Sequence, residues 1–138
     1  MRPLPSEIIA GIRRILKESI EPELTSGHAR SRLEEVRAVL AQMDWDDFGF
    51  TLASRNRALA GVLEEIQAWR VADPARSTVI PDVAAALPGH DRLAAHQSCF
   101  EELAGSVVAL VDPLGDWVTA HPEDSDAARL RKELLEAL

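Results

Sequence analysis

Leucine, isoleucine and valine recur at every third or fourth position along most of this chain, a spacing that places them on one side of an α-helix. The first such stripe consists of Ile8, Ile12, Ile15, Leu16 and Ile20. Isoleucine is only an average helix former, so this helix has to be held by packing of its stripe. No segment alternates apolar and polar residues for long enough to indicate a β-strand. The sequence therefore predicts an all-α fold.

Prolines and capping residues divide this pattern into separate helices. Pro22 cannot donate a backbone hydrogen bond and disfavours helix at Glu21, so it interrupts the first helix. Because most connections are short, we expect an antiparallel helical bundle of about four main helices plus a short C-terminal helix, in a single domain over residues 1–138. We expect a first helix capped by Ser6, a second helix from Thr25 or Ser26 to about Asp44, and a third helix that ends near Val71. A fourth helix is expected from Asp91 to Val111, followed by a stop or sharp kink at Pro113. Ser125 or Asp126 is expected to cap a last helix.

The segment of about residues 73–90 differs from the rest. Pro74, Pro81, Pro88 and Gly89 divide it into pieces too short for a full helix, although residues 79–80 can touch the core and residues 82–87 can form one or two helical turns. A long irregular segment inside a compact domain is usually functional or disordered. A lid, a partner-binding arm and a disordered loop all remain open interpretations.

Charge and cysteine content narrow the classes of function. The chain has 15 Lys and Arg against 23 Asp and Glu, a net charge of −8, so it lacks the basic excess that general nucleic-acid binding requires. Its longest uncharged apolar stretch, Leu103–Val111, is far shorter than the ~20 residues that span a bilayer, and no signal peptide precedes the first helix. We therefore expect no membrane contact. The single cysteine, Cys99, excludes an internal disulfide, which makes the cytoplasm the expected location.

His96, Cys99 and Glu102 follow each other at three-residue steps, and all three side-chain types bind zinc or iron. At about 100° per residue, however, His96 lies in the middle of the apolar stripe of its helix, Cys99 at its edge and Glu102 on the polar side. One helix cannot direct all three to a single ion, and the Glu-x-x-His pairs of di-iron bundles are missing. We predict no metal site and no cofactor, and expect a core histidine and a small buried thiol.

Four basic side chains are candidates for binding a small acid. His28 and Arg30 lie near the start of the second helix, where an arginine beside free backbone amides can hold a carboxylate or phosphate. The ordinary alternative is that neighbouring capping and acidic residues satisfy both groups. Arg55 flanks the apolar stripe of the third helix, and His28, Arg55 and His96 would form a polar pocket if they meet between helices.

The opening segment also carries a family resemblance. Its residues are Arg2-Pro3, Glu7-Ile8-Ile9, Ile12-Arg13 and Leu16, followed by Pro22-Glu23-Leu24 and His28-Ala29-Arg30. Up to Met43 the chain resembles short bacterial helical domains of unknown function encoded near aminoglycoside-phosphotransferase-like kinases and acyl-CoA dehydrogenases. The resemblance implies an accessory role beside acyl-CoA or kinase-type enzymes, and the family brings no activity or catalytic residue with it.

No nucleophile elbow, phosphate loop or zinc-protease motif is present, and the chain has no tyrosine, so we assign no catalytic residue. Amphipathic helices with an acidic surface favour a non-catalytic module that works through protein contacts, as a homodimer or beside another protein. The alternative is a small-molecule-binding protein or enzyme with an inter-helix pocket lined by His28, Arg55 and His96. A third hypothesis is a regulatory component that neutralises a basic partner.

Overall fold

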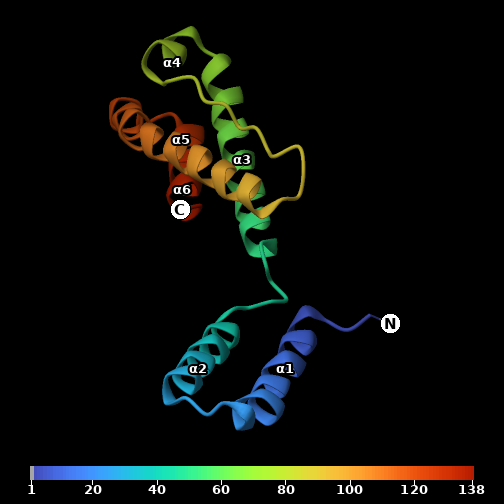
Figure 1. The fold of residues 1–138 in the computed structure, drawn as a ribbon. Coiled ribbons are helices and arrows are strands. Elements are labelled where there is room, and N and C mark those ends of the chain that lie inside the picture. The colour runs from blue at the N-terminus through green and yellow to red at the C-terminus, as the bar shows by residue number, and fades with distance from the viewer. Residues whose placement is uncertain (1) are drawn as a thin grey trace. The chain divides into compact units, whose positions relative to one another are not determined.

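The computed structural model describes residues 2–138, and all of its regular structure in that range is helical (Figure 1). The all-α prediction is confirmed. The elements are α1 (Pro5–Ile15), which continues as a π-helical turn (Leu16–Ile20) and a 3-10 turn (Glu21–Glu23), then α2 (Gly27–Gln42), α3 (Phe50–Val71), α4 (Pro74–Val79), α5 (Leu93–Ala120) and α6 (Ser125–Glu136).

The contacts within the chain form two compact units, where the sequence predicts a single domain over residues 1–138. One unit ends at Phe48 and holds α1 and α2, and the other begins at Gly49 and holds α3 to α6. In the first unit, α1 and α2 contact each other and run in opposite directions, so they form a helical hairpin (Figure 1).

The two helices of the hairpin begin in different ways. Ser26, one of the two residues at which the second helix was expected to begin, caps α2, with its Oγ accepting a hydrogen bond from the Ala29 amide at 3.3 Å. The prediction that Ser6 caps α1 is wrong, because α1 already begins at Pro5. The backbone amide and hydroxyl of Ser6 instead donate to the two carboxylate oxygens of Asp46, at 3.0 and 2.6 Å. Asp46, which follows α2 in the sequence, therefore satisfies an N-terminal amide of α1, and these bonds lower the pKa of its carboxyl group below the usual value.

No side chain among residues 2–48 is buried. The sequence predicts that the isoleucine stripe of α1 packs into a bundle core, and in this unit that expectation is wrong. The physical reason is geometric, because two helices can cover only one side of each other and further helices are needed to enclose a core.

The second unit has the core that the hairpin lacks. Helices α3, α5 and α6 pack against one another, and α4 packs on α3. Their apolar stripes are buried, although Leu135 and Leu138, whose spacing from Leu130 and Leu134 also predicts an inner position, are exposed. The core comprises Leu59, Leu63, Ile66 and Trp69 of α3, Leu103, Val107, Leu110, Leu114 and Trp117 of α5, and Leu130 and Leu134 of α6, together with Ile80 and smaller residues.

The segment expected to be irregular is ordered against this core. Its first part forms the short helix α4, capped by Asp73, whose Oδ1 accepts from the Ala75 amide at 2.8 Å. Ile80 is 1% exposed and so reaches the core as expected. The helical turns expected at residues 82–87 are not formed, since residues 81–88 have no regular structure. The guanidinium group of Arg70 fixes the end of α4 by donating to the carbonyls of Ile80 (2.6 Å) and Ser77 (3.3 Å).

Helix α5 corrects another expectation, because it continues through Pro113 to Ala120 without the predicted stop. Proline removes one backbone hydrogen bond from a helix interior. Leu110 and Leu114, on either side of Pro113, are both fully buried. Burial of the apolar side therefore outweighs the loss of that bond.

One helix within residues 2–138, α5, is long and apolar enough to cross a membrane, judged by length and composition alone. The core helix of a soluble protein passes the same test. Six side chains of α5 are buried within its unit, among them Leu103, Val107 and Leu110. The absence of a membrane contact stays a prediction.

Candidate functional site

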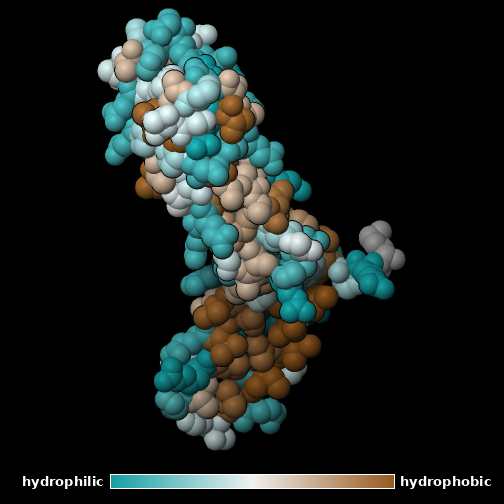
Figure 2. All heavy atoms as spheres, turned by 90° about the horizontal axis from the view of Figure 1, so that it is seen from above, coloured by the Kyte–Doolittle hydropathy of each residue, from teal (hydrophilic) through white to brown (hydrophobic). Residues whose placement is uncertain are grey.

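The hairpin has a large apolar surface that neither of its own two helices covers. Eight of its large aliphatic side chains are each between 40 and 58% exposed. We refer to these residues as the apolar face: Leu4, Ile8, Ile12, Ile15 and Ile20 from the first helix and its extension, and Val36, Val39 and Met43 from α2 and its C-cap. Figure 2 shows strongly hydrophobic side chains gathered in one continuous area of the visible surface. Exposed apolar areas of more than a few hundred Å² mark sites of interaction.

On α1, the exposed stripe and the α2-facing side are different sides of the helix. Ile9 and Leu16 are half-buried, which marks the side of α1 toward α2. At about 100° per residue, the exposed stripe of Ile8, Ile12 and Ile15 lies roughly a quarter turn from these residues. Ile8, Ile12 and Ile15 therefore cannot be covered by α2.

The same separation holds on α2, and in the same rotational direction. Leu33 and Leu40 are half-buried and mark the side toward α1, while Val36, Val39 and Met43 lie roughly a quarter turn away. Two antiparallel helices side by side are related by a two-fold axis perpendicular to the plane that contains them. On each helix the exposed stripe is rotated from the half-buried side by about the same angle and in the same direction. The two-fold axis therefore places both exposed stripes on the same side of the hairpin, and the apolar face is one surface.

Two of the predicted ligand-binding residues lie on this hairpin. His28 and Arg30 are both exposed in the first turn of α2. The Arg30 Nε donates to the Leu24 carbonyl at 2.9 Å, so this side chain fixes the turn that precedes the helix. This partner is a backbone carbonyl and not one of the capping or acidic residues expected in the ordinary alternative, and ligand binding by His28 and Arg30 stays a prediction.

The other two predicted residues lie in the second unit. Arg55 is exposed on α3, and its neighbour Asn56 is the residue that reaches His96, with Nδ2 donating to the His96 carbonyl at 2.9 Å. The His96 side chain is 15% exposed, and its Nε2 lies 3.6 Å from Asp91 Oδ1. Asn56 itself is completely buried. The structure thus brings His96 beside Asn56, and the pocket shared by His28, Arg55 and His96 stays a prediction.

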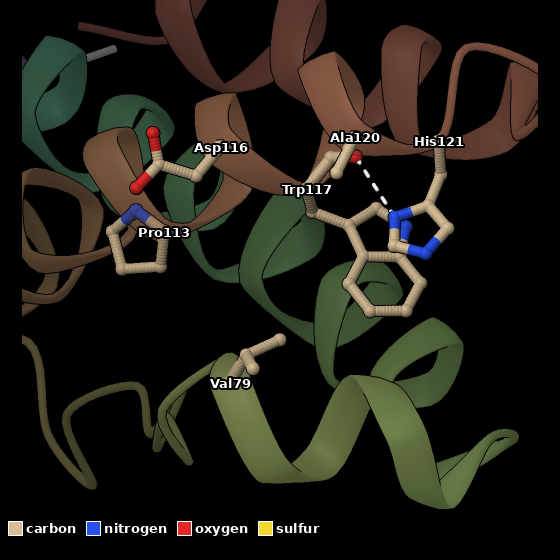
Figure 3. Close-up of a pocket in the computed structure, with 6 residues that line it drawn as sticks. All are labelled: Val79, Pro113, Asp116, Trp117, Ala120 and His121. Carbon is tan, nitrogen blue, oxygen red and sulfur yellow. Dashed lines mark hydrogen bonds between the residues drawn. The ribbon is translucent and has the colours of Figure 1, made fainter.

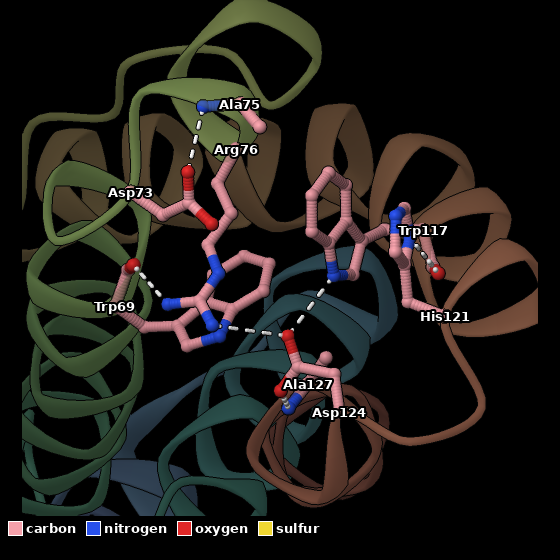
Figure 4. Close-up of polar contacts among 8 residues, drawn as sticks. All are labelled: Trp69, Asp73, Ala75, Arg76, Trp117, His121, Asp124 and Ala127. Atoms are coloured by element: carbon pink, nitrogen blue, oxygen red, sulfur yellow. Dashed lines mark hydrogen bonds and ion pairs between the residues drawn. The ribbon is translucent and has the colours of Figure 1, made fainter.

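A polar cluster that the sequence analysis missed joins four helices of the second unit (Figure 4). At its centre is Asp124, the N-cap of α6, whose carboxylate accepts from the Ala127 amide (3.0 Å), the Trp117 indole (3.1 Å) and Arg76 (3.2 Å). Burial by itself raises the pKa of the Asp124 carboxyl, but the hydrogen bonds and the nearby Arg76 charge outweigh it, so the pKa lies below its usual value.

Arg76 extends this cluster to α3. Its guanidinium group lies over the Trp69 ring at 4.5 Å and donates to the Trp69 carbonyl at 2.9 Å. Every oxygen of Asp124 and the charge of Arg76 are thus engaged with the protein itself, which is typical of a contact that holds helices together. An acidic residue just before a helix is a typical N-cap, and this signal could have identified Asp124. The sequence instead predicted Ser125 or Asp126 as the cap of the last helix, and this prediction is wrong.

A cavity of about 390 Å³ lies beside this cluster (Figure 3). Pro113 and Asp116 lie at one end and Trp117 and His121 at the other, with Val79 of α4 opposite. His121 stacks on Trp117, with ring centroids 3.8 Å apart, and its Nδ1 lies 3.1 Å from the Trp117 carbonyl. Both rings are thereby fixed in position as walls of the cavity.

The other side chains considered for chemistry are Cys99 and the groups that could bind a metal ion. Cys99 is buried, its Sγ lies 3.4 Å from the Ala86 carbonyl, and burial raises the pKa of the thiol. Within the described part of the chain, no three His, Cys, Asp or Glu side chains form a group that could hold a metal ion.

Comparison with protein-family models, curated proteins and solved structures finds no match to this chain.

Proposed function

We propose that the chain is a non-catalytic protein-interaction module and that the apolar face of the hairpin is its contact surface. The observation that carries this proposal is the contrast between the two units. Residues 2–48 bury no side chain, whereas the second unit buries a complete apolar core. A partner that covers the apolar face would supply the missing half of a core.

The energies support the need for such a partner. Full burial of an aliphatic side chain is worth about 1.5–3 kcal/mol, so each half-exposed member of the apolar face can still contribute about 1 kcal/mol. Eight of them together offer on the order of 8 kcal/mol, comparable with the whole stability of a small domain. Short helices are marginal in water without tertiary packing. Covering the apolar face is therefore the largest single gain in stability open to this unit.

The polar residues of the second unit support a scaffold role for that unit. Asp124 accepts hydrogen bonds from Arg76 and the Ala127 amide, which joins helices, and His121 is held by stacking on Trp117. Such contacts fix a core in place and leave the interaction to the hairpin.

Site-specific photo-cross-linking in cells tests this proposal. A benzophenone amino acid at position 12 lies within the apolar face, and the matched control at position 10 replaces Ala10, which is exposed on the opposite side of the same helix. We expect position 12 to form a covalent adduct with a protein and position 10 to form none. Equal labelling at both positions, or none at position 12, would contradict the proposal.

A further inference from the structure

We infer that the partner is a second copy of this chain, whose hairpin packs its own apolar face on the first to form a four-helix bundle. This inference rests on the proposed function and names its partner. Both exposed stripes lie on one side of the hairpin, so two hairpins can meet face to face about a two-fold axis. Each copy then supplies two of the four helices that such a core requires.

The charges around the apolar face fit a second copy. The segment up to Phe48 carries seven Lys and Arg against nine Asp and Glu, so its net charge is only −2, while the remaining residues carry −6. On α1, Arg14 lies farther from the apolar face, and the acidic residues Glu7 and Glu18 border it. Arg32 and Glu35 do so on α2, where they also form an ion pair at 2.7 Å. With a net charge of only −2 on each copy, the repulsion between two copies is small, and a strongly basic partner would find little acidic excess here.

The size of the surface also fits a dimer. Eight aliphatic side chains that are each about half exposed present apolar area on the order of 500 Å², and the polar border brings this toward the ~800 Å² per partner of a standard stable interface. The core of such an interface is more apolar than its rim, which is the arrangement found here. The apolar face therefore has the area and composition of one half of a dimer interface.

The inference is tested by the mass of the purified full chain in solution. We expect twice the 15.1 kDa of one chain by light scattering or sedimentation. Ile12→Asp combined with Val36→Asp puts two carboxylates into the apolar face and should give a single chain, with dissociation at least 100-fold more favourable. The matched control, Ala10→Asp with Ala38→Asp, adds the same charge to exposed positions away from that face and should remain a dimer.

A second measurement covers the case in which the double variant loses its helices. Benzophenone at position 12 of the purified chain should produce a covalent species of twice the chain mass under light, and benzophenone at position 10 should not. A wild-type chain that stays at 15.1 kDa at its highest soluble concentration would overturn the inference. If position 12 then captures a different protein in cells, the proposed function stands without the second copy, and if it captures nothing, both fall.

Discussion

Replacing Asp124 should show how far one carboxylate holds the second unit together. In the Asp124→Ala variant, α6 loses its N-cap, which costs about 1 kcal/mol. The buried indole N–H of Trp117 loses its acceptor, which costs about 1–3 kcal/mol. Loss of the ion pair with Arg76 adds about 1 kcal/mol at most to the loss of stability, because the Arg76 side chain is 21% exposed and solvent screens the pair. Because these contacts share one side chain, we expect a total loss of about 3 kcal/mol in the free energy of unfolding.

The pH dependence of the stability distinguishes the contribution of the Asp124 charge from that of its hydrogen bonds. The folded-state pKa of Asp124 lies below that of the unfolded chain. Its ionised form therefore contributes stability that is fully present above the unfolded value of about 3.9 and is lost as the pH falls through the lower folded value. The Asp124→Asn variant keeps an acceptor for the Ala127 amide, should lose less stability than Asp124→Ala at neutral pH, and should lack this acid-sensitive part.

Urea unfolding followed by tryptophan fluorescence measures these differences, since Trp69 and Trp117 are both buried in this unit. The matched control is Asp126→Ala, which removes an exposed carboxylate from the first turn of the same helix. An Asp124→Ala variant within about 0.5 kcal/mol of the wild type would refute the reasoning, because that is the range of ordinary surface substitutions.

Three further predictions concern single residues. Gly105→Ala should raise the free energy of unfolding by about 1 kcal/mol, because a Cβ at this position of α5 meets open space. Gly49→Ala should lower the free energy of unfolding by about 1–3 kcal/mol, because Gly49 has a φ of +103° and its Cβ would lie 3.2 Å from Leu93. Urea unfolding that gives both changes the same sign would contradict this. Cys99 should react slowly with a thiol reagent in the folded chain and much faster in urea, because it is buried and its pKa is raised; equal rates would show that the thiol is accessible. Ser6→Ala should raise the pKa of Asp46 toward its usual value in an NMR titration, and an unchanged pKa would show that the serine hydroxyl does not bind it.

Much of the fold follows from local sequence signals. The spacing of Leu59, Leu63 and Ile66 predicts a helix with one buried side, and the structure buries all three. The start of the second helix near Thr25 or Ser26 and the end of the third helix near Val71 were also predicted correctly, since both depend on residues close in sequence. The stop expected at Pro113, as one of two alternatives, is not formed, because its local cost is outweighed by burial of residues that only the packed helices bring together.

The candidate site was hidden from the sequence for a physical reason. The spacing of Ile8, Ile12 and Ile15 says that these residues share one side of a helix, but it cannot say whether that side is covered within the same chain. Buried stripes and interface stripes have the same period. Asp124 was missed for a related reason, because its contacts with Arg76 and Trp117 come from two other helices.

Hydrogen exchange of the hairpin, measured as a function of protein concentration, tests the central claim most directly. A hairpin without buried side chains should exchange its amides quickly when dilute, and should gain protection when its apolar face is covered. We predict that residues 5–15 and 27–42 become protected as the concentration rises, while the amides of α5 are protected throughout. Protection of the hairpin that is the same at every concentration, or a hairpin that exchanges quickly at every concentration and with every cellular fraction added, would contradict the account.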